Sequence, residues 1–220
     1  MAGPFPIRAA APGQAVPAGR MGYDLDAERL LLHTVQPAEA FDALLTTGTL
    51  RPDANLADDE FADAYDWIHR MMAARLPTSG EGALWLWART RREHLVAACR
   101  QSRGQVLLTC RVPRERVLLS HFDEWHLVLN KCLGMPRRPG ESEDDAFTRW
   151  EQTQDAFDVR LRAAGMRAAP IREWPADLRA EIEKSWECIL DRANYGPHEC
   201  WQATAHALHA DHVVEAVRIT

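Results

Sequence analysis

The amino-acid sequence predicts an α+β protein, in which several helices surround a central, mostly antiparallel sheet. Two patterns lead to this prediction. Short apolar runs, some alternating with polar residues, stand between turn residues, as is typical of buried or half-buried strands. Between them lie longer segments whose apolar residues recur every three or four positions, as on one face of a helix.

The ordered part of the chain is expected to begin after an N-terminal leader. Residues 1–20 are rich in Ala, Pro and Gly, so we expect a mobile leader there and a single globular domain over residues 21–220. Residues 30–35 form a continuous apolar run that predicts a buried strand. Pro37 then opens a helix, and Gly48 ends it.

Helices and strands continue to alternate through the rest of the chain. Helical spacing or helix-stop residues predict helices at about residues 59–76, 91–101, 147–161 and 176–190. Strand patterns are found at residues 83–88, 106–112 and 117–119. The segment from residue 199 to residue 219 is ambiguous, because its alanine content favours a helix whereas its valines favour a terminal hairpin.

Composition excludes several functional classes. The formal net charge of −6 argues against binding of nucleic acid, although a few arginines cluster near residues 89–103. The apolar runs are far shorter than the roughly 20 residues that span a membrane, so we expect no membrane association. The first residues lack the apolar core of a secretory signal, and the five cysteines include no Cys-x-x-Cys pair. These features favour a cytoplasmic protein.

Common catalytic motifs are also absent. The chain contains neither of the glycine-rich phosphate-binding motifs, Gly-x-x-x-x-Gly-Lys and Gly-x-Gly-x-x-Gly, and it lacks the Gly-x-Ser-x-Gly elbow. A P-loop enzyme, a Rossmann enzyme and an α/β-hydrolase are therefore disfavoured.

The strongest candidate site follows the strand pair of residues 106–119. If residues 121–130 are helical, Asp123, His126 and Asn130 lie one above another on one face, with Trp125 on the opposite, apolar face. They could provide a general base, its orienting partner and an amide contact to a substrate. The alternative is an amphipathic helix with a solvated polar face.

Other candidates come from strand ends and aromatic residues. Eight tryptophans are many for 220 residues, and Trp85 and Trp87, on one face of a strand, could line a cleft for a flat ligand. His33, Thr34 and Gln36 end a buried strand, where polar residues either face a ligand or bond to the backbone. A group of potential metal ligands near the C-terminus, His198, Cys200, His206, His209 and His212, suggests a metal site, but its spacing fits none of the usual motifs, and no metal is expected.

Several short motifs resemble those of a family of uncharacterised bacterial proteins, known only as a domain of unknown function. The matching segments include Tyr65-Asp-Trp, Trp85-Leu-Trp, Phe122-Asp-Glu-Trp-His-Leu-Val-Leu-Asn130 and Gln202-Ala-Thr. The match covers about residues 30–220. The sequence departs from the family pattern at His121, where an acidic residue is expected, and at His33, where Trp is expected.

The order of the segments also resembles the ADP-ribosyltransferase-like fold. In that fold a His or Arg on the first strand holds the ribose of NAD, an aromatic residue or Ser contacts nicotinamide, and a late Glu stabilises the oxocarbenium-like centre. The resemblance gives the first role to His33 and Thr34, the second to Ser120 or Tyr65, and the third to Gln202 or Glu199. Gln202 is a departure, because an amide can hold a hydroxyl but cannot serve as a carboxylate, so Glu199 or Asp123 would have to supply the charge.

From these features we expect an ADP-ribosyltransferase-like enzyme that acts on NAD or a related nucleotide in a Trp-lined cleft. A non-catalytic ligand-binding or regulatory module on the same scaffold is one alternative, and a metal-assisted hydrolase is another. The acceptor is not specified by the sequence. Asp123, His126, Gln202 and Glu199 are the catalytic candidates, and the ligand-binding candidates are His33, Thr34, Gln36, Tyr65, Trp85, Trp87, Ser120, Trp125 and Asn130.

Overall fold

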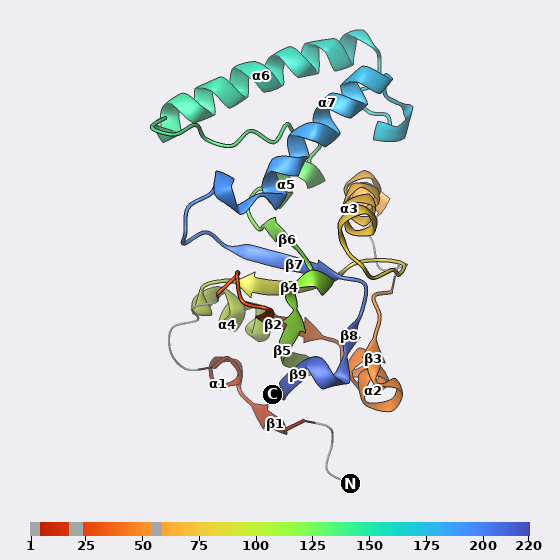
Figure 1. Ribbon diagram of the computed structural model, residues 1–220, viewed down its shortest axis with the longest axis vertical. Coiled ribbons are helices and arrows are strands. Elements are labelled where there is room, and N and C mark those ends of the chain that lie inside the picture. The colour runs from red at the N-terminus through yellow and green to blue at the C-terminus, as the bar shows by residue number, and fades with distance from the viewer. Residues whose placement is uncertain (1–4, 18–23, 54–58) are drawn as a thin grey trace. The chain divides into compact units, whose positions relative to one another are not determined.

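The computed structural model describes residues 5–17, 24–53 and 59–220, and within them the chain forms seven α-helices and two sheets (Figure 1). The predicted α+β class is therefore confirmed. The contacts divide the chain into two compact units. We call residues 1–56, 69–119 and 199–220 the sheet unit, and residues 57–68 and 120–198 the helical unit.

The main sheet has seven strands in the order β1-β9-β5-β2-β4-β7-β6. The pairs β5–β9, β2–β5, β2–β4 and β4–β7 are antiparallel, and β1 pairs with β9 in parallel. A second, two-stranded sheet joins β3 (Thr49–Leu50) to β8 (Leu208–His209). The strands of the main sheet are β1 (Ile7–Ala10), β2 (Arg29–Gln36), β4 (Leu84–Arg89), β5 (Val106–Pro113), β6 (Leu118–His121), β7 (Trp201–Ala205) and β9 (Val213–Ile219).

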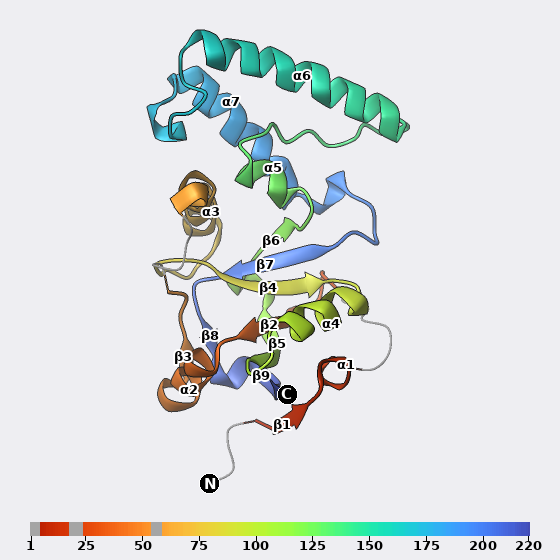
Figure 2. The same ribbon diagram turned by 180° about the vertical axis from the view of Figure 1, so that it is seen from behind.

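Helices α1 (Pro12–Ala15) and α4 (Arg92–Gln101) lie beside each other against the sheet, as Figure 2 shows. Their buried apolar side chains form one cluster with Leu107 of β5 and Val217 of β9. Helix α2 (Ala38–Thr47) follows β2 and ends at Gly48, whose φ of 75° is the left-handed conformation that glycine adopts at low cost. The predicted strand and helix at this point of the sequence are thus confirmed.

The N-terminal segment corrects one expectation. We expected residues 1–20 to be a mobile leader, but residues 5–17 form β1 and α1 and pack on the sheet unit. Phe5 is buried, with its ring 6.3 Å from that of Phe41, and Ala15 and Val16 lie in the cluster under α4. Backbone pairing of β1 with β9 needs no large side chains, which is why composition alone was misleading.

The C-terminal segment is neither a helix nor a hairpin. β7 and β9 are both strands, but β7 pairs with β4 and β9 pairs with β5. Three strands therefore separate them in the sheet. The chain passes from β7 to β9 through β8 and a turn at Ala210–His212.

The helical unit contains α5 (Trp125–Leu129), α6 (Glu143–Ala163) and α7 (Ala176–Trp186), while α3 (Ala62–Arg75) begins in it and ends in the sheet unit. Its core is aromatic: the ring of Trp67 stacks at 6.5 Å on Trp125 and meets Trp186 edge-on at 5.6 Å. The predicted helix of residues 121–130 proves shorter, since it spans only α5. Within the described ranges, no helix is long and apolar enough to cross a membrane.

Candidate functional site

Three strands of the sheet unit bring predicted site residues into one line. His33 of β2 is paired with Trp87 of β4, and Trp87 is paired with Gln202 of β7. On the other side of β2, His33 is paired with Thr109 of β5. Directly paired residues of antiparallel strands present their side chains on the same face. We call Thr109, His33, Trp87 and Gln202 the cross-strand row.

His33 occupies the middle of the cross-strand row and is almost fully buried, with 1% of its surface exposed. Its Nδ1 lies 3.1 Å from the hydroxyl oxygen of Thr109. Burial lowers the pKa of His33 from 6.5 to about 4. The imidazole is therefore uncharged at neutral pH and acts through hydrogen bonds rather than through charge.

Gln202 lies at the β7 end of the cross-strand row, and its side-chain amide has one hydrogen-bonding group without a partner among the described residues. The residue is 7% exposed, and its amide nitrogen Nε2 is buried without a hydrogen-bond partner among the described residues. Leaving a buried donor unpaired costs about 1–3 kcal/mol. Such an unpaired group in a folded protein needs an explanation, and one possible explanation is that a water molecule or a ligand binds to it.

The other predicted residues of this region bond to one another. Thr34 donates its hydroxyl to the carbonyl oxygen of Trp85 at 2.9 Å, and Gln36 donates from Nε2 to the Thr34 hydroxyl at 2.7 Å. The bond from Thr34 joins β2 to β4, and the bond from Gln36 holds the Thr34 hydroxyl within β2, so both residues brace the sheet next to the cross-strand row.

Trp85 and Trp87 lie on one face of β4, as predicted. Both are half-buried, whereas Leu84, Leu86 and Ala88 on the other face are buried. The ring of Trp87 packs partly against the apolar cluster under α4. One side of Trp87 thus belongs to the core, and the Trp-lined cleft remains a prediction.

The Asp123, His126 and Asn130 stripe lies in the helical unit, and its side chains are exposed. The Nδ1 of His126 lies 3.0 Å from the carbonyl oxygen of Asp123, and Asn130 donates its amide to the carbonyl oxygen of His126 at 2.7 Å. These contacts go to the backbone and tie the two ends of the short helix α5. On the inner side, Trp125 is buried and meets the ring of Tyr65 edge-on at 6.3 Å.

His121 was not among the candidate site residues predicted from the sequence. It is 4% exposed, and its Nδ1 accepts the backbone N–H of Glu124 at 3.2 Å, so the ring proton is on Nε2. Its ring stacks on Tyr195 with the centroids 4.1 Å apart. The one signal in the sequence was its departure from the resembled family's pattern. Ser120, just before it, is fully buried, and its hydroxyl has no hydrogen-bond partner within the described ranges.

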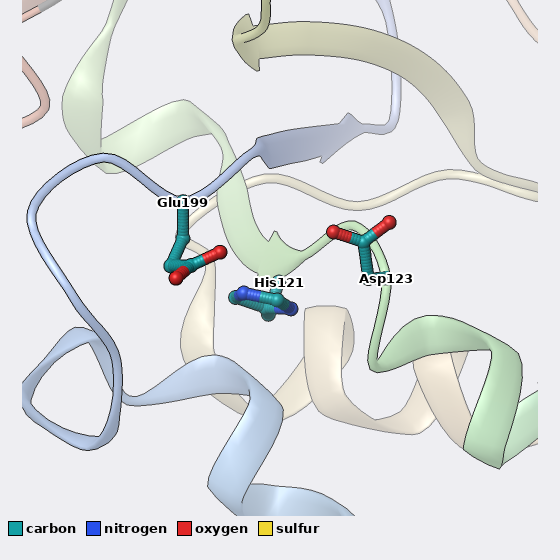
Figure 3. A group of neighbouring side chains, drawn as sticks. All are labelled: His121, Asp123 and Glu199. Carbon is teal, nitrogen blue, oxygen red and sulfur yellow. The ribbon is translucent and has the colours of Figure 1, made fainter. Parts of the chain in front are cut away.

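Figure 3 shows His121 at the end of β6 and Asp123 just after it. One ligand atom of His121 lies within 4.8 Å of one carboxylate oxygen of Asp123. Glu199, which the same figure labels, is an exposed residue of the sheet unit that stands two positions before β7. The catalytic candidates are thus divided between the two units, with Asp123 and His126 in one and Gln202 and Glu199 in the other.

The C-terminal histidines bond to threonines. Nδ1 of His206 lies 2.9 Å from the Thr78 hydroxyl, and Nδ1 of His209 lies 3.2 Å from the Thr49 hydroxyl. Burial lowers the pKa of His206 and of His212. In the part of the chain that the structure describes, these histidines belong to no group of three metal-ligating side chains.

Comparison with known proteins adds one finding. The family model described as "Domain of unknown function (DUF3841)" matches residues 31–214, which include every strand of the main sheet except β1 and parts of β2 and β9. No match is found among curated proteins or among solved structures. The cross-strand row falls entirely inside the matched range.

Proposed function

We propose a function from the sheet unit itself, since the chain belongs to the DUF3841 family and that family's description assigns no activity. The protein binds a nucleotide-type ligand over the cross-strand row, and NAD is the first ligand to test. This proposal keeps the resemblance to ADP-ribosyltransferase-like proteins as its guide to the ligand.

The observation that carries the proposal is the register of His33, Trp87 and Gln202. These residues are far apart in the sequence, yet they occupy directly paired positions on β2, β4 and β7. The resemblance assigned a histidine of the first strand and a polar residue of a late strand to one nucleotide site. A ring that can stack on a base lies between them, and the buried amide nitrogen of Gln202 lacks a partner among the described residues.

The chemistry of the cross-strand row favours binding over group transfer. Cleavage of a glycosidic bond needs a carboxylate to stabilise an oxocarbenium-like transition state. Gln202 offers an amide at the position that the resemblance gives to a glutamate, and His33 is uncharged at neutral pH because its pKa is lowered to about 4. The four members of the row can hold and orient a ligand, but none of them carries a negative charge.

A ligand panel tests the proposal directly. NAD, ADP-ribose, nicotinamide and adenosine are each added at millimolar concentration, followed by thermal-shift and calorimetric titration. We expect NAD or one of its parts to raise the Tm, and we expect Gln202→Ala to weaken that binding about tenfold, the value of one well-placed hydrogen bond. Gln152→Ala, the same change at an exposed position of α6, should bind like the wild type.

Two outcomes would contradict this function. If no member of the panel shifts the Tm, nucleotide binding is excluded at these concentrations. If the wild type releases nicotinamide from NAD, and Glu199→Gln or Asp123→Asn abolishes the release, the protein is a transferase or glycohydrolase rather than a binding module.

A further inference from the structure

The side-chain amide of Gln202 lies inside the sheet unit without a hydrogen bond to any described residue. Gln202 is 7% exposed, and its Nε2 is buried and unpaired. Its Oε1 accepts no hydrogen bond within the described ranges either. An amide offers N–H donors and a carbonyl acceptor, so a buried one normally bonds through both ends. Gln154 of α6 does so, since its Oε1 accepts the backbone N–H of Leu133 and its Nε2 donates to Asp158, both at 2.8 Å.

An aromatic ring stands directly beside this unpaired amide. Gln202 of β7 is paired with Trp87 of β4, and Figure 2 shows the two strands side by side. The Cβ atoms of directly paired residues are about 4.5–5.5 Å apart, so the amide and the indole can contact the same small molecule. Trp87 is half-buried, with one side against the apolar cluster under α4. The pair thus combines a flat apolar surface with an unpaired donor and an unpaired acceptor.

These two features select one kind of ligand. A ligand group that only accepts, or only donates, would leave the other end of the buried Gln202 amide unpaired, which costs free energy. A group with an N–H donor beside an acceptor satisfies both ends at once, as a glutamine does when it binds the edge of adenine. A planar ring that carries this group can also stack on Trp87.

We infer that Gln202 and Trp87 bind a flat ring that carries an N–H donor next to an acceptor. An aromatic carboxamide, as in nicotinamide, and the edge of an aminopurine, as in adenine, both have this chemistry. The inference rests on the proposed function, and it names the part of the nucleotide that the protein recognises.

Small aromatic probes test the inference on the full chain. Nicotinamide and adenosine carry the donor, whereas methyl nicotinate and purine riboside lack it. Proton–nitrogen NMR of nitrogen-15-labelled protein follows the titrations, with Gln202→Met and Trp87→Phe assigning the two side-chain signals. We expect nicotinamide or adenosine to shift both signals, and the analogue without the donor to bind about tenfold more weakly or worse. The probe that binds shows whether the carboxamide or the aminopurine is recognised.

Gln202→Met also shows whether the amide serves a ligand or the fold. Methionine has a similar length but neither hydrogen-bonding end. Because an unpaired buried amide does not stabilise the fold, the variant should keep or raise the Tm while probe binding weakens about tenfold or more. Gln154→Met is the matched control: it breaks two hydrogen bonds, so it should lower the Tm and bind the probes like the wild type.

Three results would overturn the inference. One is a fall in the Tm of Gln202→Met as large as that of Gln154→Met, because the amide would then support the fold. The others are equal binding of each probe and its analogue without the donor, and no binding of any probe. If the probes bind as expected but NAD and ADP-ribose do not, the proposed nucleotide function fails and the inference about the ring stands.

Discussion

At the scale of single residues, His33 shows how burial changes the chemistry of a side chain. An imidazole in water is protonated over part of the physiological pH range. At 1% exposure the charged form loses its hydration, so the pKa of His33 falls from 6.5 to about 4. His33 is thus a neutral hydrogen-bonding group held between Thr109 and Trp87.

This burial predicts a specific dependence of stability on pH. Between pH 6.5 and pH 4 the unfolded chain binds a proton at His33 that the folded protein does not bind, so stability falls as the pH falls through this window. For His33 alone, lowering the pH from about 7 to about 5 should reduce the free energy of unfolding by about 2 kcal/mol. Urea titrations at the two pH values measure the loss.

The control for this prediction is His33→Gln, which has no titrating group at the same position. His206 and His212 also have pKa values lowered by burial, so the variant keeps their contribution to the pH dependence. The loss on acidification should be smaller in the variant by about the amount assigned to His33. Equal losses in both proteins would show that His33 does not titrate as its burial implies.

At the scale of elements, a loop that passes close to a helix limits the size of the side chains that its positions can carry. The segment after α5 passes the end of α7 so closely that a Cβ at Gly134 would lie 2.6 Å from the carbonyl oxygen of Ser185 and 2.9 Å from Sγ of Cys188. The backbone N–H of Gly134 donates to the hydroxyl of Ser185 at 3.0 Å. Trp186 donates its indole N–H to the carbonyl oxygen of Cys132 in the same region.

We therefore expect Gly134→Ala to destabilise the protein by about 1–3 kcal/mol, because the added methyl group must push the segment away from α7. Chemical denaturation measures the change. Gly13→Ala is the control, since a Cβ at Gly13 of α1 meets nothing within 4 Å. That variant should be unchanged or stabilised by about 0.5–1 kcal/mol, and a similar destabilisation of both would contradict the packing argument.

The elements differ in how well local sequence predicts them. β2, α2 and β4 carry their own signals: apolar runs, a proline near the helix start, a glycine stop and an alternating tryptophan pair. β1 has no such signal, because its order comes from backbone bonds to β9, more than 200 positions away. The region of β7 and β9 stayed ambiguous between a helix and a hairpin, and nothing local shows that these strands pair with β4 and β5 rather than with each other.

At the scale of the whole molecule, the division into two units separates residues that the sequence reasoning had placed in one site. His33 and Gln202 were both predicted as site residues, and their direct alignment through Trp87 depends on strand order, which sequence patterns do not contain. The Asp123, His126 and Asn130 stripe was predicted from helical spacing, yet its polar atoms close the ends of α5 through backbone contacts. In the sequence, Thr109 is one polar residue of a predicted strand. Only the strand pairing shows that its hydroxyl lies next to the ring of His33.

The parallel pairing of β1 with β9 has a practical consequence for work with this chain. The strand order places β1 at one border of the main sheet, where it covers the backbone N–H and C=O groups of β9. A version that starts after residue 17 would expose these groups as an open edge, which invites pairing with other molecules. We expect such a version to self-associate more strongly with rising concentration than the full chain, as measured by light scattering. Arg8→Ala, which removes the ion pair to Glu215 but keeps β1, should not do so.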